Sequence, residues 1–155
     1  MHPKDRDLLQ LQSFLTFRLA RVHARLNTQA GNLLRQTSDI SLSQWRVLAM
    51  IGAGGADTVF AADIRRVMGF DKGLFSRTLQ GLSKDGLVRS ATDIQDHRRQ
   101  RLSLTEDGRE VYDRTLPVMR GRQNKLRAAL EPEELTALMS ALDKLEAVVA
   151  QDDEA

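Results

Sequence analysis

Apolar residues in the first third of the chain predict two helices separated by a polar loop. Between Asp5 and Arg35 they recur at steps of three and four, which is typical of one stripe of a long helix. Residues 37–39 read as the loop, and Ser43 is expected to cap the second helix. The two buried sides are expected to carry Leu8, Leu11, Leu15, Leu19, Val22 and Leu26, and then Trp45, Val47, Leu48 and Ile51.

The middle third predicts two short helices followed by a hairpin. Residues 61–68 form the first helix, and Gly69 after it suits a left-handed C-cap. Asp71 is expected to cap the second helix, which would bury its apolar residues and end at Gly86. Two β-tolerant segments, 87–91 and 100–104, then flank the polar turn 92–99 and read as a hairpin. The apolar residues of the second helix are Phe75, Leu79 and Leu82.

The last third predicts two further helices. Thr105 is expected to cap a long one, and Pro117 inside it should either bend the helix or split it. The final helix is expected to start at Pro132. The predicted fold class is therefore mainly α, an α+β winged helix with about six helices and a two-stranded β-hairpin as the wing.

Composition limits the kind of protein that this fold can be. The chain has 155 residues, 41% of them apolar and 28% charged, which suits one compact domain. Cysteine is absent, which excludes disulfides, thiolate metal sites and thiol chemistry. No apolar run is long enough to cross a membrane and the first residues do not resemble a secretion signal, so we expect a cytoplasmic protein with no membrane partner. No catalytic or metal-ligand spacing is present, and neither an enzyme nor a metal or other cofactor is expected.

Charge is unevenly distributed along the chain. Residues 1–59 carry a net charge of +3, residues 60–101 carry +4, and residues 102–155 carry −5. A basic middle third is typical of a domain that binds a polyanion with one face, although an unevenly charged solvated surface would give the same counts.

The helix–turn–helix and hairpin of this basic third form a winged helix-turn-helix, an arrangement that binds DNA. One helix fits the major groove, and the hairpin beside it can reach the flanking backbone or the minor groove. The outer side of the second helix offers side chains suited to bases and phosphates, and the hairpin turn adds further cations. The helix residues are Lys72, Gly73, Leu74, Ser76, Arg77, Gln80 and Lys84; the turn residues are His97, Arg98 and Arg99, and Arg101 follows the turn.

The segments FDKGLFSRTLQGLSKDGLV and DIQDHRRQRLSLTEDG resemble the MarR family of bacterial transcriptional regulators. The resemblance implies that residues 71–84 form the recognition helix. It also implies that Asp96 and Arg98 are the wing signature, in which the carboxylate orients the arginine toward the minor groove. The family often has a small residue where Arg65 stands and an arginine where His97 stands.

The same resemblance implies a homodimer built from the N-terminal and C-terminal helices. We therefore expect residues 1–36 to form a dimerisation helix, 37–104 the DNA-binding lobe, and 105–155 two further dimerisation helices. Family members commonly sense aromatic acids, so a small aromatic effector is a possible ligand. Its pocket is assigned to Phe14, Phe17, Arg18, Arg21 and Trp45, although Trp45 also suits the core.

Two functions remain open at this point. The first is a ligand-responsive repressor that binds a pseudo-palindromic duplex as a homodimer. The second is a winged-helix dimer that serves as a protein-interaction module and has no operator of its own. The second hypothesis explains the fold equally well, but it leaves the basic residues on one helix and on the hairpin tip unexplained.

Overall fold

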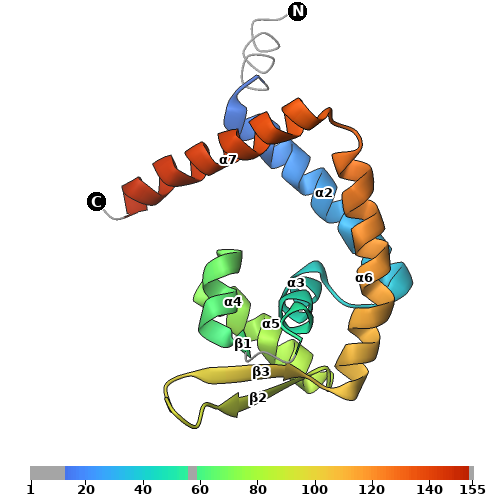
Figure 1. The fold of residues 1–155 in the computed structure, drawn as a ribbon, viewed down its shortest axis with the longest axis vertical. Helices are drawn as coiled ribbons and strands as arrows, with labels where there is room; N and C mark the ends of the chain where they lie inside the picture. Colours follow the sequence, from blue (N-terminus) through green and yellow to red (C-terminus); the bar gives the residue numbers. More distant parts are fainter. Residues whose placement is uncertain (1–12, 56–58, 154–155) are drawn as a thin grey trace, which may run out of the picture. The chain divides into compact units, whose positions relative to one another are not determined.

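The computed structural model describes residues 13–55 and 59–153, which contain six helices and three strands (Figure 1). The chain folds as two compact units, Met1–Val118 and Met119–Ala155. In order, the elements are α2 (Leu15–Thr37), α3 (Leu42–Ala53), β1 (Val59–Phe60), α4 (Ala61–Met68), α5 (Lys72–Lys84), β2 (Val88–Thr92), β3 (Gln100–Leu104), α6 (Glu106–Arg127) and α7 (Pro132–Asp153). Leu8 and Leu11 of the predicted first helix lie outside the described residues.

The sheet contains one more strand than the predicted hairpin. Its order is β1-β3-β2, and both pairs of strands are antiparallel. β2 and β3 form the hairpin, with Val88 opposite Leu104 and Thr92 opposite Gln100. β1 adds two residues to the free edge of β3, with Val59 opposite Leu102 and Phe60 opposite Arg101. A strand this short shows no alternation of apolar and polar residues, so periodicity alone could not reveal it.

The predicted cap of the second helix is wrong by two residues. Ser41, not Ser43, is the N-cap of α3. Its hydroxyl accepts a hydrogen bond from the backbone N–H of Gln44 at 3.1 Å, and the Gln44 side chain accepts one from the Ser41 N–H at 2.9 Å. This reciprocal pair is a capping box, and a serine followed three residues later by glutamine is its sequence signal.

The predicted caps at Asp71, Thr105 and Gly69 are confirmed, whereas α2 begins only at Leu15 and includes Thr37, which was predicted to lie in the loop. The Asp71 carboxylate accepts a hydrogen bond from the Leu74 N–H at 2.9 Å, and the Thr105 hydroxyl accepts one from the Gly108 N–H at 2.9 Å. Gly69 ends α4 in the left-handed conformation, with φ at 61°. α6 continues through Pro117, so the proline does not split the helix.

The core of the first unit centres on α3. Val47 and Leu48 are fully buried, and the Trp45 ring stacks on Tyr112 of α6 with ring centres 6.1 Å apart. Gly52 permits this approach of α3 to α6, because a Cβ at that position would lie 2.5 Å from the Tyr112 ring. Figure 1 shows α4 and α5 beside the three-stranded sheet, and both helices contribute buried residues.

The second unit consists of the end of α6 and of α7, whose side chains are described as far as Ala150. The N-terminus of α7 is capped by Glu134, whose carboxylate accepts a hydrogen bond from the Glu131 N–H at 2.9 Å. None of the described side chains of α7 is buried. Its large exposed apolar residues are Leu138, Met139, Val148 and Val149.

Candidate nucleic-acid interface

α5 has one buried face and one exposed face, as its periodicity predicts. Phe75, Leu79 and Leu82 are buried as expected, and Thr78 is buried with them. The Thr78 hydroxyl donates to the Leu74 carbonyl at 2.8 Å, so burying it leaves no unpaired polar group. The opposite face is polar and cationic. Its exposed residues are Lys72, Ser76, Arg77, Gln80 and Lys84, while Gly73 and Leu74 are half-buried.

Both ends of α5 are held by hydrogen bonds. Asp71 caps the N-terminus, and a Cβ on Gly73 would lie 3.2 Å from both the Asp71 carboxylate and the Arg77 guanidinium. The absence of a side chain at Gly73 therefore leaves room for Arg77 to lie along the first turn. At the other end, the Gln44 amide donates to the Asp85 carboxylate at 3.1 Å and joins the start of α3 to the end of α5.

The tip of the hairpin is a closed turn built around Asp93. One oxygen of the Asp93 carboxylate accepts hydrogen bonds from the N–H groups of Gln95 and Asp96, both at 2.9 Å. The backbone closes the turn further, because Asp93 donates to the Arg99 carbonyl and Arg99 to the Asp96 carbonyl, each at 2.9 Å. The bond from Asp96, the bond from Gln95 and the charges of Arg101 and Arg99 hold the pKa of Asp93 below its ordinary value of 3.8.

Asp96 supports the wing through the backbone. Its carboxylate accepts a hydrogen bond from the N–H of Arg98 at 3.0 Å, two residues further on. The resemblance implied that this carboxylate orients Arg98; the contact that is present is to the Arg98 backbone. Within the described part of the chain, the Arg98 guanidinium and the His97 ring have no ion-pair partner, and both residues are exposed.

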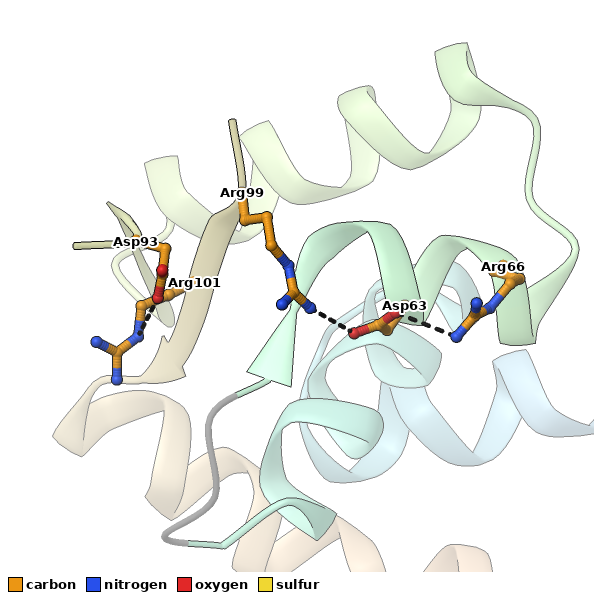
Figure 2. A network of polar contacts seen from close by, with 5 residues as sticks. All are labelled: Asp63, Arg66, Asp93, Arg99 and Arg101. Atoms are coloured by element: carbon orange, nitrogen blue, oxygen red, sulfur yellow. Dashed lines mark hydrogen bonds and ion pairs between the residues drawn. The ribbon is translucent and has the colours of Figure 1, made fainter. Parts of the chain in front are cut away.

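Arg99 and Arg101, by contrast, are engaged in ion pairs within the protein (Figure 2). The Arg99 guanidinium lies 3.3 Å from the Asp63 carboxylate of α4 and 3.4 Å from the centre of the Phe60 ring. Arg101 Nε lies 3.8 Å from the Asp93 carboxylate, whose side chain is only 13% exposed. Of the four basic residues predicted for the wing, His97 and Arg98 are therefore exposed at its tip, whereas Arg99 and Arg101 form ion pairs within the protein.

The residues assigned to an effector pocket do not come together as one cavity. Trp45 is buried against Tyr112. Phe14, Phe17, Arg18 and Arg21 are exposed around the first turns of α2. A hydrogen bond between α2 and α3 lies further along α2, where the Arg46 side chain donates to Asn27 at 3.4 Å. Asn27 is thirteen positions after Phe14 along the helix, which is a rise of about 20 Å.

Sequence reasoning missed three residues of this region: Asp63, Phe60 and Asp93. An aspartate at the start of a polar turn commonly bonds to the backbone two residues on, so the position of Asp93 was a usable signal. Asp63 and Phe60 contact Arg99 across a gap of more than thirty residues, which no local pattern reveals. No described helix is long and apolar enough to span a bilayer, and the described residues include no cluster of three potential metal ligands.

Comparison with known proteins gives a consistent picture. Residues 38–99 match the model of the MarR family. The HTH-type transcriptional repressor IacR of Pseudomonas putida is 25% identical over 119 residues, which cover 77% of this chain and 70% of that protein.

Solved structures agree with this match. A MarR-family transcriptional regulator from Silicibacter pomeroyi is 29% identical, with a TM-score of 0.68 over 90% of this chain and 92% of its own. S. aureus MepR in its DNA-binding conformation is 21% identical and shares the fold, with a TM-score of 0.78 over 88% of this chain and 98% of its own. The chain is therefore similar to MarR-family transcriptional regulators, and residues 38–99 carry the match to the family model.

Proposed function

We propose that this protein is a transcriptional regulator, a sequence-specific DNA-binding repressor that acts as a homodimer in the cytoplasm. The observation that carries the proposal is the division of α5 into a buried apolar face and an exposed polar, cationic face. A helix whose outer face is built in this way, on a scaffold that fixes both of its ends, suits the major groove of B-DNA. The related S. aureus MepR, which shares this fold, has been solved as a DNA complex.

Each exposed side chain of α5 suits a particular DNA group. Arg77 can bond to both acceptors of a guanine, and Gln80 can pair with an adenine. Lys72, Ser76 and Lys84 suit phosphates, and Gly73 and Leu74 bring the first turn close to the backbone. We assign base recognition to Arg77 and Gln80. The other exposed residues of α5 are assigned to positioning the helix on the DNA backbone.

The wing supplies a second contact through its tip. Arg98 and His97 are exposed there, and a cation of this kind suits the narrow, negative minor groove beside the site of α5. Asp96 contributes indirectly, since its carboxylate holds the Arg98 N–H and so fixes the backbone that carries this arginine. We assign the minor-groove contact to Arg98.

Dimerisation is supported by the apolar surface of the terminal helices. α2 exposes a group of large apolar side chains, and α7 has none of its described side chains buried. A patch of this kind on a soluble chain marks an interaction surface, and two-fold pairing is the commonest way to cover one. The dimer would present two α5 helices to half-sites about one helical turn, or roughly 34 Å, apart. The exposed apolar residues are Leu15, Phe17, Leu19 and Val22 of α2, together with Phe14 directly before it.

Regulation by a small aromatic acid is the remaining part of the proposal. Phe14, Phe17, Arg18 and Arg21 offer aromatic faces and cations on one exposed stretch of α2, which suits an aromatic carboxylate. Trp45 is left out of this assignment because it belongs to the core. A ligand that binds one spacing of the two α5 helices better than another would shift the population toward that spacing.

A gel-shift experiment tests the function directly. The probe is a duplex carrying the DNA upstream of the protein's own gene, and the competitors are the same duplex and a scrambled one. We expect a retarded band that only the matching competitor removes, and a mass in solution of twice the 17.4 kDa protomer. No retardation, or equal competition by both duplexes, would contradict the proposal and favour the protein-interaction module.

The effector is tested by repeating the gel shift with benzoate, salicylate and phenylacetate. We expect at least one of these carboxylates to weaken the retarded band, and the Arg18→Ala and Arg21→Ala variants to need more of it. If none of the three changes binding, the aromatic-acid part of the proposal is wrong while the DNA-binding part stands.

A further inference from the structure

Arg99 joins the wing to the first helix of the helix–turn–helix. It is the last residue of the hairpin turn, and its side chain crosses β1 to reach α4 (Figure 2). Its guanidinium lies over the Phe60 ring, 3.4 Å from the ring centre, and donates to the Asp63 carboxylate at 3.3 Å. A cation placed between an aromatic face and a carboxylate gains from both, and its orientation is thereby defined.

Asp63 is itself held from two sides. It lies in the first turn of α4, where the field of the helix favours a carboxylate. Its second oxygen pairs with Arg66, one turn later on the same helix, at 3.1 Å. Asp63 therefore presents a fixed acceptor to the wing.

The backbone pairing of the wing with β1 is short. β1 contributes only two residues to the ladder with β3, and α4 follows β1 without an intervening loop. The backbone of Arg99 also closes the tip, since its N–H bonds to Asp96 and its carbonyl accepts from Asp93. Holding the Arg99 side chain in place therefore also holds the backbone of the turn. Arg98 is the neighbouring residue, one position closer to the tip.

We propose that Asp63 and Arg99, seated on Phe60, form a latch that sets the position of the wing tip relative to the helix–turn–helix. Asp63 is then a positioning residue for DNA recognition, although it does not itself contact DNA. The inference rests on the proposed function, because a fixed tip matters when α5 and the wing must enter neighbouring grooves together. Preorganisation of this kind favours the specific complex, whereas non-specific binding depends mainly on charge.

The latch can first be tested without DNA. Because the chain has no cysteine, an Ile94→Cys variant carries a single nitroxide label on the wing, at a side chain that is 80% exposed. In this labelled protein we expect Asp63→Ala and Arg99→Gln to increase the mobility of the label in its electron paramagnetic resonance spectrum. The control Asp113→Ala removes an exposed carboxylate from α6 and should leave the spectrum unchanged. Unchanged spectra in both latch variants would overturn the proposal.

DNA-binding measurements test whether the latch contributes to recognition of the specific site. The specific probe is the duplex that the wild-type protein enriches from a random pool, and the non-specific probe is poly(dI-dC). We expect Asp63→Ala and Arg99→Gln each to weaken specific binding by about fivefold, the upper range for an exposed ion pair, and to leave non-specific binding undiminished. The double variant should lose no more than either single one, and Asp63→Glu should restore most of the affinity.

Several outcomes would contradict the latch. Equal losses on both probes would indicate general destabilisation, and additive losses in the double variant would show that the two residues act independently. If Arg99→Gln lowered the salt dependence of binding by about 0.9 per protomer, Arg99 would be a phosphate contact instead. If the wild-type protein bound neither probe, the proposed function would fail, while the label experiment would still decide whether the latch exists.

Discussion

At the scale of single residues, the candidate site depends on side chains that begin or end helices. Asp71 starts α5 at the residue before Lys72, and Ser41 and Gln44 start the helix on which α5 packs. Gln44 then reaches the far end of α5 through Asp85. These hydrogen bonds fix where α5 begins and tie its far end to α3.

Replacing Asp71 tests the cap of α5. Asp71→Ala removes the acceptor for the Leu74 N–H, and we expect the free energy of unfolding to fall by about 1 kcal/mol. Asp71→Asn keeps an acceptor of the same shape and should cost much less. Urea denaturation followed by circular dichroism measures both. Equal losses in the two variants would show that the capping bond does not contribute.

Two glycines of α6 make a matched pair. A Cβ on Gly108 would lie 1.9 Å from the Leu87 carbonyl oxygen, whereas a Cβ on Gly121 would have no neighbour within 4 Å. We expect Gly108→Ala to destabilise the protein by about 1–3 kcal/mol, because backbone must move away. Gly121→Ala should stabilise it by roughly 0.5–1 kcal/mol through helix propensity. Thermal denaturation measures both variants. If their melting temperatures shift in the same direction, this description of the packing is contradicted.

At the scale of elements, local patterns predicted most of the helix–turn–helix and the hairpin. The apolar spacing of α5, the cap at Asp71 and the end of α4 at Gly69 are all readable from neighbouring residues. The failures have physical causes. β1 has too few residues to show a period. The cap at Ser41 was missed although Gln44, three residues later, carries the sequence signal of a capping box. The contact between Arg99 and Asp63 depends on how the sheet places the wing beside α4.

The pH dependence of the wing turn tests the role of the Asp93 carboxylate. Hydrogen bonds from Asp96 and Gln95 hold the pKa of Asp93 below 3.8, so the charged form stabilises the folded turn. This stabilisation is complete well above pH 3.8 and is lost as the pH falls through the lowered pKa. Carbon-13 NMR should place the Asp93 midpoint below 3.8, and the amide signals of Gln95 and Asp96 should move with it. A midpoint at or above 3.8 would contradict the turn.

At the scale of the whole molecule, the second unit has an exposed apolar surface that the proposed dimer would cover. On α7 the stripe is Leu135, Leu138, Leu142, Leu145 and Val149, with the alternating steps of three and four that suit helix packing. We expect Leu138→Glu to weaken dimerisation at least tenfold, because it places a charge in an apolar interface. Sedimentation equilibrium measures this, with Lys144→Glu on the same helix as the control. A dimer as tight as the wild type would exclude this stripe from the interface.

The salt dependence of DNA binding decides whether α5 and the wing tip of a dimer bind DNA together. We would measure affinity for the upstream duplex against salt for the wild type, Arg77→Ala, Arg98→Ala and the control Arg114→Ala, an exposed arginine of α6. We expect Arg77→Ala to lower affinity and discrimination between duplexes, and Arg98→Ala to lower the log–log salt slope by about 0.9 per protomer, or roughly 1.8 per dimer. Arg114→Ala should behave as the wild type. If Arg77→Ala and Arg98→Ala also bind as the wild type at every salt concentration, α5 and the wing tip do not bind DNA together.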